Sequence, residues 1–165
     1  MDAIARYTPA LCRKARRLLG NAADAEDVVQ SLFAELVQRG RTDVDLPYLF
    51  RAVTSRCLNL VRDGGNRRRL LERQEPALRG PVRTRFDDQV IGMDLMVKVV
   101  DRLDGPCAEA LVYRYFDDMT HDEIAEVQDV TRKTVAARLA RVHDVVAALL
   151  GTGGGSSAGG SGGGP

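Results

Sequence analysis

Two segments carry polar side chains at a spacing that suits contact with nucleic acid. The first has guanidinium and hydrogen-bonding groups at steps of four, four and three residues: Arg51, Ser55, Asn59 and Arg62. Residues three or four apart share one face of a helix, so these groups would form one stripe. A basic run follows at once: Arg67, Arg68 and Arg69. The spacing alone leaves open a charged face that only contacts solvent.

The second segment has the pattern of a helix-turn-helix. Thr120-His121-Asp122-Glu123 matches a capping box, a break falls near Asp129, and Thr131 can cap a further helix. A helix-turn-helix inserts the start of its second helix into the major groove. That start offers groups for phosphates and base edges: Thr131, Arg132, Lys133, Thr134, Arg138 and Arg141. A helical hairpin with a solvated basic face is the alternative.

A third set of polar residues is mostly acidic and lies on the expected helix that ends before Gly40. One face of this helix carries Asp24, Asp27, Gln30, Ser31 and Glu35. Acidic residues near a helix N-terminus are stabilised by the helix dipole, so they need no partner to be explained.

Apolar residues recur with a period near 3.6 along most of the chain, which predicts an all-α protein without strands. We expect the first helix to start at Thr8-Pro9 and to stop at Gly20, and the second to start near Asp24. The third should run from Leu46 to Arg62, closed by Gly64-Gly65. Helical pattern resumes near Asp88, where Ile91, Leu95, Val99 and Leu103 recur at steps of four. Asp104-Gly105-Pro106 then predicts a turn, with Pro106 at the start of the next helix.

These helices group into two small domains and two other segments. We expect an N-terminal helical bundle at 1–63 and a C-terminal four-helix domain with the helix-turn-helix at 87–150. An Arg-rich flexible connector spans 64–86, and 151–165 is a disordered Gly/Ser tail.

Charge is distributed unevenly although the formal net charge is only +1. Residues 46–85 carry ten basic and three acidic side chains, whereas residues 86–130 carry three basic and twelve acidic ones. Residues 131–150 are basic again, with four basic groups and one acidic group. Local basic segments are what binding to a polyanion requires.

Several classes of function find no support in the sequence. The three cysteines, Cys12, Cys57 and Cys107, form no CxxC pair, and we expect reduced, half-buried thiols of a cytoplasmic protein. The two histidines are isolated, so no metal site is expected. No recognisable catalytic set, phosphate-binding loop, cofactor site or membrane-spanning run is present, and we expect no enzyme.

The order of these parts resembles the sigma-70 family of RNA polymerase specificity subunits, in its extracytoplasmic-function (ECF) group. The resemblance spans roughly residues 5–148. It depends on Ala15–Gly20, Asp24–Gln30 and Tyr48–Arg62 for the family's first domain. It depends on Thr120–Glu126 and Thr131–Arg141 for the C-terminal helix-turn-helix.

The resemblance implies a sigma factor that initiates transcription at specific promoters, with polymerase core and promoter DNA as partners. The acidic face, from Asp24 to Glu35, would bind the polymerase core. The Arg51 stripe with Arg67 and Arg68 would bind and open the minus-ten element. The helix that starts at Thr131 would read the minus-thirty-five element. The resemblance also implies regulation by an anti-sigma factor, and the sequence identifies none.

Three positions depart from the family pattern. Ser55 replaces the usual Asn, Asp129 stands where the turn often has Gly, and Ala136-Ala137 replace a Lys-Ser pair. Losing Lys and Ser removes two potential phosphate contacts. Two other classes therefore stay open: a stand-alone helix-turn-helix regulator, and an adaptor that docks on polymerase without strong DNA reading.

Overall fold

A computed structural model describes the backbone of residues 2–71, 84–86 and 89–151. In these ranges the chain forms seven helices and one two-stranded sheet. The helices are α1 (Asp2–Leu19), α2 (Ala22–Gln38), α3 (Leu46–Leu71), α4 (Met93–Asp101), α5 (Gly105–Tyr115), α6 (His121–Gln128) and α7 (Arg132–Leu150). The strands are β1 (Thr84–Phe86) and β2 (Gln89–Ile91). The all-α fold class is confirmed, but the expectation that the chain has no strands is wrong, because β1 and β2 form a short hairpin.

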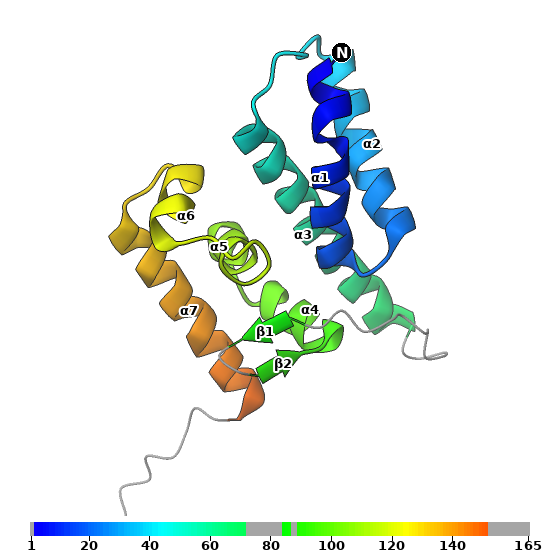
Figure 1. The fold of residues 1–165 in the computed structure, drawn as a ribbon. Coiled ribbons are helices and arrows are strands. Elements are labelled where there is room, and N and C mark those ends of the chain that lie inside the picture. The colour runs from blue at the N-terminus through cyan, green and yellow to red at the C-terminus, as the bar shows by residue number, and fades with distance from the viewer. Residues whose placement is uncertain (1, 72–83, 87–88, 152–165) are drawn as a thin grey trace, which may run out of the picture.

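The first three helices form a bundle (Figure 1). Their apolar stripes bury Leu11 and Leu18 of α1, Leu32 of α2, and Leu49 and Val53 of α3. Gly20 ends α1 with φ +77° and Gly40 follows α2 with φ +64°, a left-handed conformation that glycine adopts without steric cost. The two predicted helix stops are therefore confirmed.

The start of α1 differs from the prediction. Thr8-Pro9 lies inside the helix, which begins at Asp2. An interior proline loses one backbone hydrogen bond, but the turn before it is held by tertiary contact. Tyr7 is partly buried against the common core. Packing therefore overrides the local signal for a helix start.

Helix α3 begins at Leu46 as predicted but continues through Gly64-Gly65 to Leu71. A glycine in a helix costs only about 1 kcal/mol relative to alanine, which is too little to end a long helix. The predicted connector at 64–86 therefore starts in a helix and ends in strand β1. Residues 72–83 lie outside the described residues, as does most of the predicted tail.

Residues expected to begin a helix near Asp88 instead form the second strand of the hairpin. Thr84 pairs with Ile91 and Phe86 with Gln89, in antiparallel register. Ile91 is therefore strand, and α4 starts at Met93 after Gly92 at the N-cap position. Ile91 lies four residues before Leu95 and so fits the helical spacing by coincidence. It is a β-branched residue at the end of a strand that directly precedes α4.

Side-chain caps fix the starts of the last three helices. Asp104 accepts a hydrogen bond from the amide of Cys107 at 2.8 Å, with Pro106 in the first turn of α5. Thr120 and Glu123 form the predicted capping box of α6. Thr131 caps α7 by accepting from the amide of Thr134 at 3.2 Å. These three starts confirm the predictions made from local sequence.

One apolar core crosses both halves of the chain. Leu49 and Leu58 of α3, Val99 of α4, Leu111 of α5 and Val142 of α7 belong to the same buried cluster. A smaller cluster lies under the helix-turn-helix and includes Tyr113, Ile124 and Val135. Figure 1 shows α5 between the α1–α3 bundle and the α6–α7 pair. The two helical units therefore pack against each other through α3.

Periodicity misplaces two apolar residues. Val37 and Leu60 follow their apolar neighbours at helical spacing, which predicts that they are buried, yet they are 57% and 37% exposed. In their place α3 buries Thr54 and Leu58 on the side that meets α4 and α5. Cys57 and Cys107 are fully buried rather than half-buried, and Cys12 is intermediate.

Candidate nucleic-acid interface

The start of α7 presents basic side chains to solvent. Arg132 and Lys133 are exposed, and Arg132 makes a surface ion pair with Asp122 of α6 at 3.5 Å. Exposed pairs of this kind contribute little stability, so a phosphate could replace Asp122 at low cost. Arg141 is exposed further along the helix. The amides at the N-terminus of α7 add the positive end of the helix dipole.

The other residues predicted on α7 have structural contacts. Thr131 is the N-cap, and its hydroxyl lies 3.0 Å from that of Thr134. Arg138 is half-buried and donates to Gln128 Oε1 at 2.8 Å, while Gln128 Nε2 donates to the carbonyl of Pro106 at 3.0 Å. Arg138 therefore helps to join α7 to the turn and to α5, and is less available to DNA than Lys133.

The turn before α7 is tight because Asp129 adopts a left-handed conformation. Its φ and ψ are 52° and 51°. Non-glycine residues pay a steric cost there, and Asp is among the few that tolerate it. Asp129 therefore adopts the left-handed conformation for which a turn often uses glycine.

The predicted stripe on α3 is one surface, and most of it is exposed. Arg51, Ser55 and Asn59 are exposed. Arg62 is half-buried because its Nη2 donates to the carbonyl of Leu103, after α4, at 3.3 Å. The stripe therefore borders the second helical unit. Arg67 and Arg68 lie in the last turns of α3, and their side chains are outside the described residues.

An exposed aromatic ring that was not among the predicted residues lies at the start of this stripe. Tyr48 lies three residues before Arg51 and is 36% exposed. The Arg41 guanidinium carbon lies 4.9 Å from the centre of the Tyr48 ring. Exposed aromatic rings with adjacent guanidinium groups are the surfaces on which single-stranded bases stack. The signal was present in the sequence as a tyrosine at helical spacing from the stripe.

Three of the five residues predicted on α2 are exposed together. Asp27, Gln30 and Ser31 share one face. Asp24 is half-buried and bonded to the N-cap Asn21, whose Nδ2 donates to its carboxylate at 2.7 Å. Glu35 is tied to Arg39 at 2.9 Å and to Arg56 of α3.

The electrostatics of Glu35 follow from that second pairing. Hydrogen bonding from Arg56 is the main reason that the pKa of Glu35 lies below its usual range. The ion pair joins α2 to α3, so Glu35 also has a structural role. The polar face of α2 that remains open is centred on Asp27 and Gln30.

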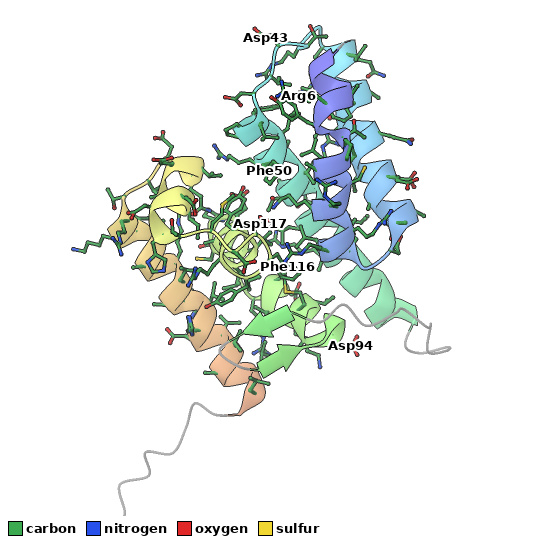
Figure 2. All side chains as sticks on the ribbon, viewed as in Figure 1. Arg6, Asp43, Phe50, Asp94, Phe116 and Asp117 are labelled. Carbon is green, nitrogen blue, oxygen red and sulfur yellow. The ribbon has the colours of Figure 1, made fainter. Side chains whose placement is uncertain are left out.

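Lys14 and Asp117 form a buried contact that was not predicted from the sequence. They form an ion pair between α1 and the end of α5, with side chains 3% and 10% exposed. The Lys14 ammonium lies 5.2 Å from the ring centres of both Phe50 and Tyr113. Figure 2 shows Phe50 and Asp117 where the two helical units meet. Partners 103 residues apart give no local signal.

In the described ranges, no group of three or more His, Cys, Asp or Glu residues could hold a metal ion. Among the helices that the structure describes, none has both the length and the apolar character needed to cross a bilayer.

Two family models match the chain, in order. The model described as sigma-70 region 2 matches residues 3–68, and that described as sigma-70, region 4 matches residues 94–142. These 66 and 49 residues make 115 of 165. A co-crystal structure of the sigma factor RpoE with the anti-sigma factor NepR, from Bartonella quintana, is similar at 16% identity and a TM-score of 0.48, covering 93% of this chain and 97% of that chain. No curated protein matches this chain.

Proposed function

Because this chain belongs to the sigma-70 family, we propose that its two helical units divide promoter recognition between them. As a sigma-70 factor, the protein binds the core of bacterial RNA polymerase and promoter DNA, and it directs the polymerase to promoters. We assign the polymerase and the minus-ten element to the unit that ends with α3. The unit from α4 to α7 would read the minus-thirty-five element.

The observation that supports this assignment best is the exposed start of α7, which follows the capped helix α6 in the chain. Arg132 and Lys133 project from the N-terminus of a helix in a helix-turn-helix, where major-groove contacts are made. Arg141, further along α7, would contact the phosphate backbone of the DNA. Thr131, Thr134 and Arg138 would act mainly by positioning this helix, because each has an internal hydrogen bond.

The minus-ten element would be bound along α3. Arg51 and Arg62 would track phosphates, while Ser55 and Asn59 would bind base edges. We add Tyr48 as a ring on which an unstacked base can lie, beside Arg41. Arg67 and Arg68 would extend the basic path.

The polymerase core would bind the exposed face of α2. Asp27, Gln30 and Ser31 form its centre, and Asp24 and Glu35 lie at its edges with internal partners. Clamp surfaces that carry basic groups would suit this face.

We also place the protein in the ECF group, because its two family regions are separated only by residues 69–93. Such a protein performs no chemistry itself, needs no cofactor and acts in the cytoplasm, where the polymerase works. An anti-sigma factor is a further partner that we propose from the family resemblance alone. The region 2 match disfavours a stand-alone helix-turn-helix regulator.

Run-off transcription with core polymerase on a library of promoter fragments tests the assignment. Wild-type protein should give discrete start sites that share two upstream elements. The double substitution Arg132→Ala/Lys133→Ala should remove dependence on the upstream element, and Lys98→Ala provides the matched control because Lys98 is exposed on α4. Binding to core without specific starts would favour the polymerase adaptor instead.

A further inference from the structure

One of the four Lys and Arg side chains of α7 is partly withdrawn from solvent. Arg132, Lys133 and Arg141 are exposed, whereas Arg138 is half-buried. The Nη1 atom of Arg138 donates a hydrogen bond of 2.8 Å to Oε1 of Gln128, the last residue of α6. Arg138 therefore lies on the second helix of the helix-turn-helix but uses its guanidinium group inside the protein.

Gln128 has a fixed orientation that directs its acceptor oxygen to Arg138. Its side chain is polar, yet the residue is only 8% exposed. The Nε2 atom of Gln128 donates to the carbonyl of Pro106, in the first turn of α5, at 3.0 Å. If the amide turned over, its oxygen would face this carbonyl oxygen, and both bonds of Gln128 would be lost. The Pro106 carbonyl therefore determines which end of Gln128 meets Arg138.

The hydrogen bond between Gln128 and Arg138 crosses the turn of the helix-turn-helix. Its two residues are ten apart in the chain and lie on either side of Asp129, whose backbone is left-handed. A carboxylate adds to the restraint. The amide of Cys107 is the main reason that the pKa of Asp104 is lowered, and the charge of Arg138 acts in the same direction. Arg138 is thus held by an amide of α6 and attracted by the N-cap carboxylate of α5.

An Arg138 side chain without this bond would be placed to reach DNA. Arg138 directly follows Ala137 and lies three residues before Arg141, and both of these neighbours are exposed. Residues three apart share one side of a helix, so Arg138 adjoins a residue that we assign to the phosphate backbone. Ala136 and Ala137 are exposed between Lys133 and Arg138 and have no hydrogen-bonding side chain. Arg138 is therefore the group that could add a phosphate contact in the middle of α7.

We propose that Gln128 is a specificity-determining residue, which keeps Arg138 bonded within the helix-turn-helix and so prevents a phosphate contact that DNA of any sequence would supply. The proposal rests on the proposed function, in which α7 reads the upstream element. A phosphate contact raises affinity without regard to sequence. A guanidinium group bonded to α6 instead helps to fix the angle at which Arg132 and Lys133 enter the groove. Gln128 is a positioning residue and touches no DNA itself.

The salt dependence of DNA binding tests this assignment, because it counts phosphate contacts. Each contact with duplex DNA contributes about −0.9 to the slope of log affinity against log salt concentration. Fluorescence anisotropy would compare holoenzymes, each assembled from core polymerase and one full-length variant. Two labelled duplexes are used: one carries the upstream element found by run-off transcription, and the other carries that element scrambled. Because the core is the same throughout, differences in slope report this chain.

Gln128→Met removes the acceptor of Arg138 and keeps the length of the side chain. The slope should become steeper by about 0.9 on both duplexes, because Arg138 gains a phosphate. Preference for the upstream element should fall by about fivefold, the low end of what one base contact contributes, because α7 is less well oriented. Adding Arg138→Ala to Gln128→Met should return the slope to the wild-type value. Arg138→Ala alone should lower the preference similarly and leave the slope unchanged.

Gln128→Glu separates the two hydrogen bonds of Gln128. Like methionine, glutamate cannot donate to the Pro106 carbonyl, but its carboxylate accepts strongly from Arg138. This variant should therefore show no steeper slope than wild type and should retain most of the preference. Lys98→Ala is the surface control, since Lys98 is exposed on α4, and it should keep the wild-type preference. Circular dichroism of each variant shows whether its helices are intact.

The outcomes separate this inference from the proposed function. If Arg138→Ala alone makes the slope shallower by about 0.9, Arg138 already binds a phosphate in the wild-type protein and the proposal is wrong. A folded Gln128→Met with an unchanged slope also overturns it. If Gln128→Met does not fold, Arg138→Ala and Gln128→Glu still decide the question. A wild-type holoenzyme with no preference for an upstream element defeats the proposed function, and this inference with it.

Discussion

The two surfaces that we assign to DNA are held in different ways. The α6–α7 surface is organised by its own neighbours, with Thr120, Glu123 and Thr131 making caps within three residues of themselves. The α3 surface is organised from a distance, because its Arg62 binds the carbonyl of Leu103. The first lies within one unit, whereas the second borders the other unit at Arg62. Substitutions on α7 should therefore act within that unit, whereas those on α3 can also act through the contact between the units.

The largest effect should come from the exposed basic pair at the start of α7. Arg132→Ala/Lys133→Ala should lower affinity for duplex with the upstream element by about 100-fold, since each good contact contributes roughly 1–3 kcal/mol. Electrophoretic mobility shift with the polymerase holoenzyme measures it. Lys98→Ala should retain affinity. Equal loss in both variants would show a general charge effect and remove the special role of α7.

A smaller effect is expected on α3, and in a different step. Tyr48→Ala should reduce promoter opening by about tenfold, because stacking of one base contributes roughly 1–3 kcal/mol. Permanganate reactivity of the minus-ten thymines reports opening, while binding to upstream duplex should not change. Arg13→Ala, exposed on α1, is the control. Loss of upstream binding by Tyr48→Ala would contradict the division between the two surfaces.

Because a local cap fixes the start of α7, loss of that cap should measurably lower the free energy of unfolding. Thr131→Ala should destabilise the protein by about 1 kcal/mol, because the amide of Thr134 loses its acceptor. Urea unfolding followed by circular dichroism measures this. Thr131→Ser keeps the hydroxyl and should stay within a few tenths of a kcal/mol of wild type. A neutral Thr131→Ala would show that packing alone defines the helix start.

The cap of α5 should make the free energy of unfolding depend on pH. The amide of Cys107 holds the pKa of Asp104 below its usual value of 3.8. The folded state therefore binds this proton less readily than the unfolded chain, and the stabilisation is fully present above that value. It is lost as pH falls through the lowered pKa.

Asp104→Asn keeps an acceptor oxygen and should flatten the dependence of the urea midpoint on pH below about 4. Glu123 keeps part of the slope, because its hydrogen bond from the Thr120 amide lowers its own pKa in the same sense. An unchanged slope in Asp104→Asn would show that other carboxylates dominate acid unfolding.

The smallest effect should be a gain. Asp129→Gly should raise the free energy of unfolding by about 0.5 kcal/mol, because glycine has no β-carbon to strain the left-handed turn. The greater entropy of glycine in the unfolded chain limits the gain. Chemical denaturation resolves it when replicated. A loss of stability would mean that the Asp129 side chain makes a contact that outweighs its backbone strain.

Much of the fold could be predicted from the sequence because it depends on interactions between residues close together in the chain. The capping box at Thr120 and Glu123, the cap at Thr131 and the glycine stops at Gly20 and Gly40 were all predicted, and each forms within a few residues. Helix content and the order of the two DNA-related motifs follow from the same periodicity. The exposed stripe of Arg51, Ser55 and Asn59 was likewise predicted from spacing.

Other features depended on partners far along the chain. Pro9 lies inside α1, and α3 passes through Gly64-Gly65, because packing can outweigh propensities of about 1–3 kcal/mol. Ile91 was predicted in a helix but pairs with Thr84 in the hairpin. A helical period in the sequence does not reveal that pairing. Thr54 is buried although it is polar, since α3 is covered on a second side by the other unit.

The sequence by itself determined where most helices start and stop, and which side chains stand at the beginning of α7, because caps and periodicity are local. Only the tertiary structure decided that Lys14 is buried against Asp117, that Arg62 is partly covered, and that one core joins both units. A lysine flanked by arginines reads as a solvated charge. Its burial is tolerated because the fold places beside it a carboxylate from 103 residues away, and an unpaired buried charge is not tolerated.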